Sequence, residues 1–155
     1  EVDVMSNSTA PRDVDPDVRN APGPLSINMY LSQWMKDSHV ALLEFGTRSF
    51  DLVATDTDSA VDGLRLVLLQ LNGSTIVSVE LLHASGDNQH LLHDRVAIHH
   101  IEVTGVAGFE RRQTVLDADL QSGESYSQGK IEINVSQITT DNSVTSAKIE
   151  VRIVS

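Results

Sequence analysis

The chain contains no cysteine. This absence excludes disulfide bonds, thiolate metal sites and cysteine nucleophiles. It leaves the redox compartment open, because a domain of 155 residues buries roughly 70% of its extended surface and needs no covalent cross-link. The length fits a single folded domain.

Basic residues are also few. Eleven lysines and arginines stand against 22 aspartates and glutamates, so the formal net charge is −11. Nucleic-acid binding needs positive charge to neutralise phosphates, and an anionic membrane surface repels a chain this acidic. No apolar run approaches the length of about 18 residues that a membrane span requires. We therefore expect no nucleic-acid partner and no direct membrane insertion, and the acidity is compatible with a salty or extracellular setting.

Proline is absent after residue 24. Pro11, Pro16, Pro22 and Pro24 disfavour both helix and central strand, and residues 1–24 hold few large apolar side chains. Two interpretations stay open for this segment: a disordered leader or linker, and an extended arm that lies along a neighbouring subunit. The chain begins at Glu1 without the features of a signal peptide, which suits a processed product or a fragment. We expect the folded domain to span residues 25–155.

From residue 25 onward, short apolar segments alternate with Gly, Asn, Asp and Ser. This pattern predicts eight or nine strands spaced about 8–12 residues apart and no long amphipathic helix. The fold class is therefore all-β, an antiparallel β-sandwich of Ig-like or jelly-roll-like type. The predicted strands include residues 26–35, 39–45, 49–54, 64–71, 95–106, 114–120 and 130–138, with further strands after residue 73 and at the C-terminus. Residues 26–37 are also compatible with a short helix.

Turn chemistry marks two hairpins. Asn72-Gly73 separates two β-rich runs and predicts a type I′ turn, in which both central residues have positive φ. The last two strands fit a hairpin joined by residues 140–145, with Ile149, Val151 and Ile153 pointing inward. Residues 64–71 are apolar on both strand faces, which predicts a strand covered on two sides.

Five of the six histidines fall within residues 83–100: His83, His90, His93, His99 and His100. The strand period of two sends the side chains of His99 and His100 to opposite faces. A zinc site of His83, His93 and His100 is geometrically conceivable, although the spacing matches no established zinc signature. A pH response is a second interpretation, because the ordinary pKa of histidine is about 6.5. Solvated or hydrogen-bonded imidazoles are the third.

The acidic stretch ATDTDSAVDG offers three carboxylates, Asp56, Asp58 and Asp62, followed by Gly63. Oxygen ligands at short spacing suit calcium, so these three form a candidate calcium site, and calcium is the one cofactor we consider. The stretch departs from the EF-hand pattern. The alternative is an ordinary solvated turn, since Asp, Ser and Thr favour turns.

Signals for catalysis are weak. The chain has no G-x-S-x-G motif and no glycine-rich phosphate loop, so we expect a protein that is not an enzyme. Aromatic residues number six, and we expect Trp34 and the phenylalanines to anchor a mainly aliphatic core. N-x-[ST] sequons occur at Asn7, Asn72 and Asn134 and matter only in a glycosylating compartment.

These observations favour a structural subunit of an extracellular or viral assembly that self-associates through its N-terminal arm and sheet edges. The expected partners are copies of itself or other protein subunits. A sheet edge needs cover, because an exposed edge strand pairs readily with another chain. The alternative is a ligand-binding or adhesion β-sandwich, with calcium bound by the acidic stretch. An enzyme built on the histidines is the third hypothesis.

Overall fold

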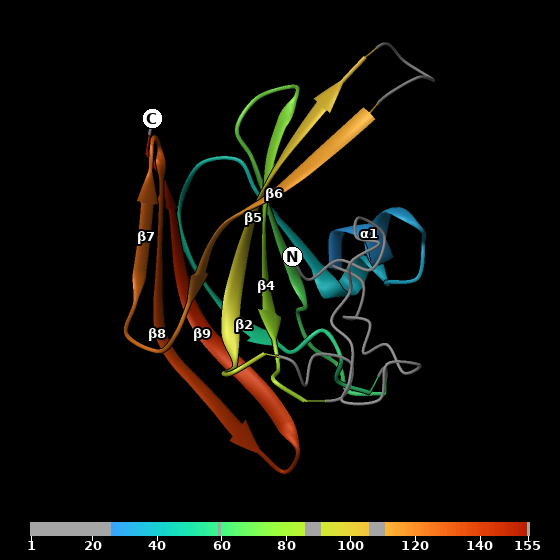
Figure 1. The fold of residues 1–155 in the computed structure, drawn as a ribbon, viewed down its shortest axis with the longest axis vertical. Helices are drawn as coiled ribbons and strands as arrows, with labels where there is room; N and C mark the ends of the chain where they lie inside the picture. The colour runs from blue at the N-terminus through green and yellow to red at the C-terminus, as the bar shows by residue number, and fades with distance from the viewer. Residues whose placement is uncertain (1–25, 59, 86–90, 106–110, 155) are drawn as a thin grey trace, which may run out of the picture.

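Two β-sheets pack face to face in the computed structural model, which describes residues 26–58, 60–85, 91–105 and 111–154 (Figure 1). One sheet has the strand order β1-β3-β4-β5-β6 and the other the order β2-β9-β8-β7, which confirms the predicted all-β sandwich. The predicted arm of residues 1–24 lies outside the described residues. The described elements are α1 (Ser26–Leu31), the 3₁₀ helix η1 (Asp37–His39), β1 (Val40–Leu43), β2 (Gly46–Val53), β3 (Leu66–Gln70), β4 (Thr75–Leu82), β5 (Arg95–Thr104), β6 (Arg111–Leu120), β7 (Ser125–Gln128), β8 (Ile131–Asp141) and β9 (Val144–Ile153).

The main apolar core lies between the two sheets. Because successive side chains of a strand point to opposite faces, every second residue reaches this core. Along β9, Ile149, Val151 and Ile153 are buried, whereas Glu150 and Arg152 are exposed, as the sequence pattern predicts.

β3 is covered on both of its faces, as its apolar run predicts. Val67 and Leu69 face the four-stranded sheet, while Leu66 and Leu68 contribute to a second apolar cluster on the outer face. β1 pairs with β3 in parallel, so the predicted antiparallel arrangement is wrong for this pair, whereas the other paired strands that the structure describes are antiparallel. The chain then crosses at residues 44–45 to β2 in the other sheet. The sequence pattern does not specify this pairing, because alternation defines strand faces and not strand neighbours.

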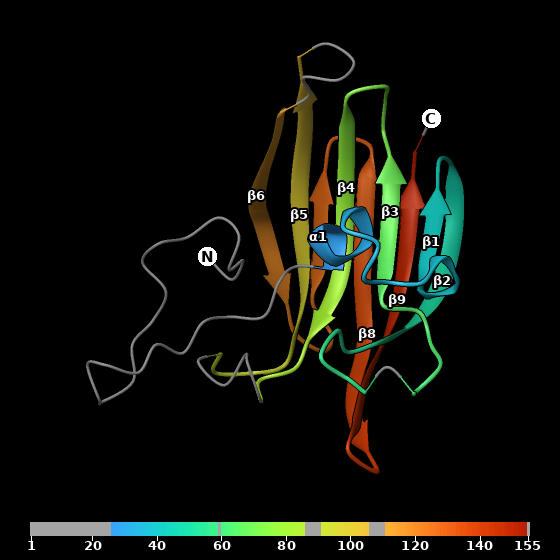
Figure 2. The ribbon, with the colours of Figure 1, turned by 90° about the vertical axis from the view of Figure 1, so that its right-hand side faces the viewer.

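Residues 26–31 form α1, so the strand predicted over residues 26–35 is wrong and the helical alternative is correct. Ile27 and Tyr30 are three residues apart, so they lie on one side of the helix, and both pack in the second apolar cluster. Figure 2 shows α1 lying across the outer face of the five-stranded sheet. The helix is followed by Gln33, whose φ of 61° is the left-handed conformation common after helix C-termini.

The two predicted hairpins differ in their turns. The β8–β9 hairpin is confirmed, with Asn142 and Ser143 at φ values of 47° and 66° between the paired residues Asp141 and Val144. The type I′ turn predicted at Asn72-Gly73 is wrong, because neither residue has positive φ. Instead, Asn72 Oδ1 accepts hydrogen bonds from the backbone N–H groups of Ser74 and Thr75 at 2.8 and 2.9 Å. An Asx turn thus replaces the left-handed turn.

β7 was not predicted. Its four residues, SYSQ, include one aromatic residue and no aliphatic residue, so the sequence lacks the apolar alternation that identifies a strand. In the structure, the side chain of Tyr126 is half-buried. β7 is held by antiparallel pairing with β8. Within the described ranges, no helix is long and apolar enough to cross a membrane.

Candidate functional site

The acidic loop between β2 and β3 is organised around Arg65, which is 4% exposed. Its Nη1 donates hydrogen bonds to the carbonyl oxygens of Thr55 and Thr57 at 3.1 and 2.6 Å. Its Nη2 donates to the carbonyl oxygens of Asp58 and Val61 at 2.9 and 3.0 Å. The loop carbonyls, which are the type of oxygen that calcium takes as ligands, are therefore bound by a guanidinium group.

The positive charge of Arg65 is stabilised by the carboxylates of the acidic loop. Burial lowers the pKa of Arg65 from its usual value, while Asp56 and Asp58 raise it. Because an arginine pKa is so high, the group stays protonated. Arg65 therefore places one permanent positive charge inside the acidic loop.

The three carboxylates of the predicted calcium site have separate surroundings. Asp58 Oδ1 accepts a hydrogen bond from the backbone N–H of Ala60 at 2.9 Å, and Asp62 Oδ1 accepts one from Gly63 N–H at 3.1 Å. The Asp62 side chain is 97% exposed, while Asp56 lines a groove described below. Two of the three thus stabilise turns in their own loop.

His39 lies buried beside this loop. Its backbone carbonyl accepts a hydrogen bond from Arg65 N–H at 2.8 Å, and its Nε2 lies 3.9 Å from Asp62 Oδ1. Burial lowers the pKa of His39 from its ordinary 6.5; Arg65 and Lys36 lower it further, and Asp62 opposes them. His39 is therefore neutral in the folded protein near neutral pH.

Acidification is expected to destabilise the domain partly through His39. Because the folded state lowers the pKa of His39, the unfolded state binds this proton more readily. The stability that His39 contributes is present above pH ~6.5 and is lost as the pH falls toward the lowered pKa. Urea unfolding of the wild type and of His39→Gln, at several values between about pH 7.5 and 5, measures the effect. Identical pH dependence in the two proteins would contradict it.

His83 and Asp94 form a hydrogen-bonded pair beyond the end of β4. His83 Nδ1 lies 2.7 Å from Asp94 Oδ1 and 3.1 Å from Thr145 Oγ1 on β9. Asp94 Oδ1 also accepts a hydrogen bond from Ala84 N–H at 2.8 Å. These contacts fix the orientation of the imidazole.

The side chain of His83 lines an open polar groove of about 590 Å³. The other lining residues come from the acidic loop, the segment after β4 and the β8–β9 hairpin: Asp56, Thr57, Asp58, Ser85, Thr140 and Ser143. The structure thus brings members of the predicted calcium and zinc sites to one groove. The sequence could not show this, because the three segments are distant along the chain.

His99 and His100 point to opposite faces of β5, as predicted: His99 pairs with Ser78 and His100 with Val77 on β4. His99 is buried on the outer face, with Nδ1 3.8 Å from Oε1 of the fully buried Glu80. Glu80 Oε2 accepts hydrogen bonds from Ser26 N–H at 2.9 Å and from the Thr55 hydroxyl at 3.2 Å. A buried carboxyl group therefore anchors the first residue of α1.

His100 lies on the other face of β5, near the β6–β7 side of the sandwich. Its Nε2 is 3.6 Å from Glu102 Oε1 and its Nδ1 is 3.7 Å from Asp117 Oδ2. The Tyr126 hydroxyl donates to Asp117 and also contacts Gln128 Oε1. Burial, then the hydrogen bond and charge of Asp117, raise the pKa of Tyr126 to about 12. Tyr126 is therefore a neutral phenol at physiological pH.

The three histidines of the predicted zinc site lie apart. His83 contacts Asp94, the residue directly before β5, whereas His100 lies five residues beyond Arg95 on β5. At about 3.3 Å per residue, the Cα atoms of Arg95 and His100 are roughly 16 Å apart along the strand. His93 is exposed in the segment before β5. Among the residues that the structure describes, no group of three or more His, Asp or Glu could hold a metal ion. The zinc and calcium sites stay predictions to which this geometry adds no support.

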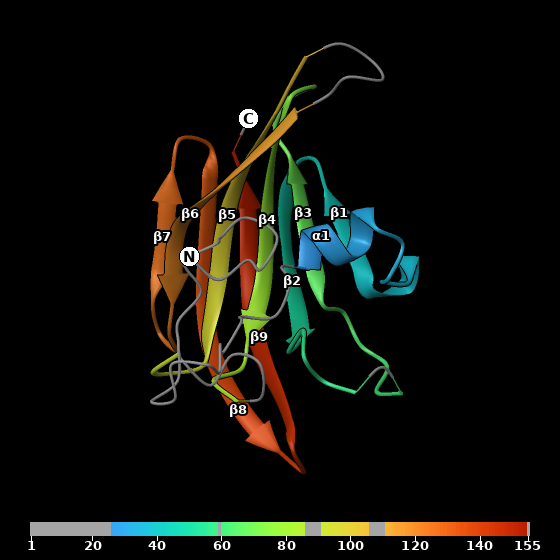
Figure 3. The same cartoon turned by 45° about the vertical axis from the view of Figure 1, so that its right-hand side comes forward.

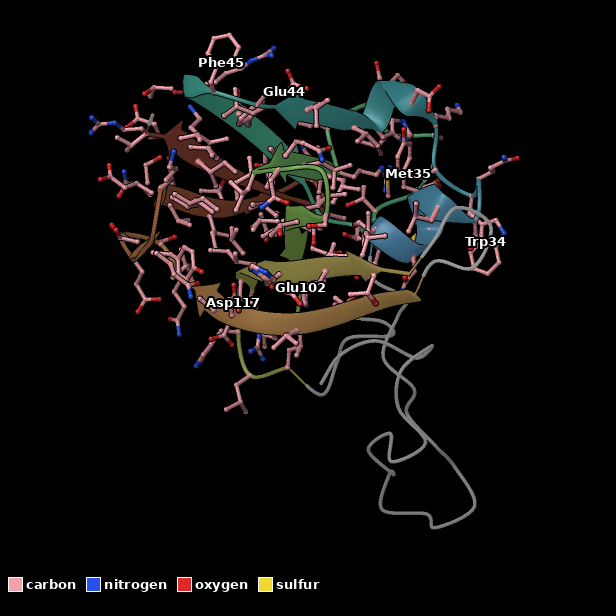
Figure 4. All side chains as sticks on the ribbon, turned by 90° about the horizontal axis from the view of Figure 1, so that it is seen from above. Trp34, Met35, Glu44, Phe45, Glu102 and Asp117 are labelled. Carbon is pink, nitrogen blue, oxygen red and sulfur yellow. The ribbon has the colours of Figure 1, made fainter. Side chains whose placement is uncertain are left out.

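Sequence reasoning missed an exposed apolar surface beside β1. Leu31, Trp34, Leu42 and Phe45 are 44%, 68%, 53% and 80% exposed. These are four of the eight exposed large apolar side chains in the described ranges, and they fall within 15 residues. Figure 4 shows Trp34 and Phe45 projecting outward at the two ends of the segment that contains η1 and β1. Leu42 lies on β1 and Phe45 follows it, and we call these two residues the β1 apolar surface; Leu31 and Trp34 lie at and after the end of α1.

The expectation that Trp34 and the phenylalanines anchor the core is therefore wrong for Trp34 and Phe45. It holds for Phe50, which is 6% exposed between the sheets. Phe45 occupies the crossing between the two sheets, where neither sheet covers it. Phe109 lies outside the described residues.

Fold and surface together define an all-β sandwich with exposed apolar side chains beside an edge strand. No protein-family model, no curated protein and no solved structure matches the chain. Its function is therefore argued from its own geometry.

Proposed function

We propose that this protein is a non-enzymatic structural subunit that self-associates through the edges of its five-stranded sheet and through its N-terminal arm. The setting we propose is an extracellular or viral assembly. The Ig-like or jelly-roll-like connectivity predicted from strand spacing remains part of this proposal. The observation that carries it is the β1 apolar surface.

The edges of the five-stranded sheet are suited to pairing with another copy. β1 and β6 are the terminal strands in the order of this sheet, and they lie on opposite sides of the sandwich (Figure 2). β6 also exposes two apolar side chains, Val115 at 49% and Leu116 at 40%. An edge strand offers unpaired backbone groups, and the neighbouring apolar side chains gain free energy when a second chain covers them. Pairing of β1 in one copy with β6 in the next would continue the sheet from subunit to subunit, a head-to-tail contact.

One further feature agrees with a second copy as the occupant, and the net charge of the chain opposes it. Residues 1–24 are covalently joined to the domain next to α1, on the outer face of the same sheet, so they have the length to reach a neighbour. The net charge of −11 opposes contact between copies. Salt screens that repulsion within about 8 Å at physiological ionic strength, so self-association is expected to strengthen as salt is added.

Substitution at β1 is expected to dissociate the assembly. Leu42→Lys and Phe45→Ser remove apolar contact, and the lysine adds an edge charge that opposes strand pairing. We expect the wild type to exceed the monomer mass at moderate protein concentration, and the double variant to be monomeric and folded. Light scattering after size exclusion, with circular dichroism for folding, measures both.

The control is Glu150→Ser. Glu150 is exposed on β9, a central strand of the four-stranded sheet, so this variant leaves both edges of the five-stranded sheet unchanged and should associate like the wild type. A chain beginning at Leu25 tests the contribution of the arm. If the wild type is monomeric at every salt and protein concentration, self-association is refuted.

A second candidate function is ligand binding or adhesion through the polar groove. The observation that favours it is the convergence of Asp56, Asp58 and the oriented His83 on one opening of about 590 Å³. A native-state ligand raises stability in proportion to ln(1 + [L]/Kd). Calcium-dependent thermal stability would therefore support this candidate, with Asp56 and Asp58 as ligands in the groove; Asp62, the third predicted ligand, does not line it.

A further inference from the structure

The sequon Asn72-Gly73-Ser74 lies at the tip of the β3–β4 hairpin. All three residues are exposed, and a side-chain atom added at Gly73 would meet nothing within 4 Å. Figure 3 shows this connection at one end of the sandwich, beyond the ends of β3 and β4. The tip is therefore open to a large modifying enzyme.

The side-chain amide of Asn72 is held through its oxygen alone. Asn72 Oδ1 accepts hydrogen bonds from Ser74 N–H at 2.8 Å, the Ser74 hydroxyl at 3.0 Å and Thr75 N–H at 2.9 Å. Within the described part of the chain, Asn72 Nδ2 donates no hydrogen bond. A substituent on Nδ2 would leave all three bonds to Oδ1 in place, so the turn would survive modification.

The sequon at Asn134 has a different geometry. Asn134 lies inside β8, paired with Ser125 on β7 and with Glu150 on β9. The hydroxyl of its sequon serine, Ser136, donates to the carbonyl oxygen of Lys148 at 3.0 Å and not to Asn134. Its backbone is fixed on both sides by neighbouring strands, so it cannot adopt a turn without breaking the sheet.

We propose that Asn72 is an N-glycosylation site and that Asn134 is not. Asn72 Nδ2 would attack the anomeric carbon of a polyprenyl-diphosphate-linked oligosaccharide. The new N–C bond forms as the bond from that carbon to the diphosphate oxygen breaks; the diphosphate leaves with the electron pair, and Nδ2 loses one proton to a base of the transferase. The glycan would project from the end of the sandwich at which β1 also ends, because Leu43 of β1 pairs in parallel with Leu69 of β3.

The test is secretion of the full chain, in an Asn7→Gln background, from cells with an active oligosaccharyltransferase. We expect a mass increase of one glycan, removable by an amidase specific for N-glycans and mapped to Asn72 by peptide mass spectrometry. Asn72→Gln and Ser74→Ala should abolish the increase, Ser74→Thr should retain it, and Asn134→Gln should leave it unchanged. Circular dichroism confirms folding of each variant.

Secretion of folded protein without a glycan at Asn72, or with one at Asn134, would overturn the inference. The inference rests on the proposed extracellular setting but not on self-association, because peptide mass spectrometry reads glycan occupancy whatever the number of subunits.

Discussion

Replacing Arg65 with methionine is expected to lower the free energy of unfolding by about 2–4 kcal/mol. Methionine keeps an unbranched side chain but removes every donor that the loop carbonyls of Thr55, Thr57, Asp58 and Val61 use. Each carbonyl left buried without a partner costs about 1–3 kcal/mol, whereas the carbonyls at the loop surface can accept a hydrogen bond from water instead. Urea unfolding followed by circular dichroism measures the loss.

Two variants sharpen this test. Arg65→Lys keeps the charge but lacks the planar fork that reaches several carbonyls at once, so it should recover only part of the stability. Arg152→Met removes an arginine that is exposed on β9, and its effect should stay within about 0.5 kcal/mol. If Arg65→Met is as stable as the wild type, the loop does not depend on the guanidinium. Repeating the unfolding with calcium shows whether the loop carboxylates also bind that ion.

Replacing Glu80 with leucine is expected to cost about 2–4 kcal/mol. The change removes the acceptor for the buried Ser26 N–H and one acceptor of the buried Thr55 hydroxyl, which also contacts Leu81 O and Ser26 Oγ. Glu80→Gln keeps one acceptor oxygen and should cost less. Because Ser26 is the first residue of α1, hydrogen exchange of the α1 amides should also accelerate, and nuclear magnetic resonance measures that exchange.

The control for Glu80 is Glu150→Leu, since Glu150 is exposed on β9 and its loss should change stability little. Equal costs for the two substitutions would show that the bonds to Ser26 and Thr55 do not stabilise α1. Loss of global stability with unchanged exchange in α1 would mean that the Glu80 carboxyl supports the sheet and not the helix.

Much of the fold follows from local patterns. Alternation in residues 144–153 predicts β9 and its inward residues, because a strand that packs on one face must bury every second side chain. The β8–β9 hairpin follows from the polar residues between two such runs. α1 is the main error in the assignment of elements. Over six residues, the spacing of its apolar side chains fits both the helical and the strand period, and packing of Ile27 and Tyr30 on the outer face of the sheet favours the helix.

The candidate sites were less predictable. The sequence groups His83 with His100, whereas the antiparallel pairing of β4 and β5 places them far apart along the sheet. The same fold brings His83 to Asp56 and Asp58, which are distant in sequence. The role of Arg65 in the acidic loop could not be predicted, because a single arginine before an apolar strand does not indicate which carbonyl groups it will contact.

The sequence by itself determined the β class and the inward faces of the strands, because side-chain periodicity acts locally. Only the tertiary structure decided which strands are neighbours, that Glu80 and His99 meet beneath α1, and that Trp34 and Phe45 stay exposed. These outcomes depend on contacts between distant segments. Burial of a polar or apolar side chain is set by what packs over it, and no local pattern contains that information.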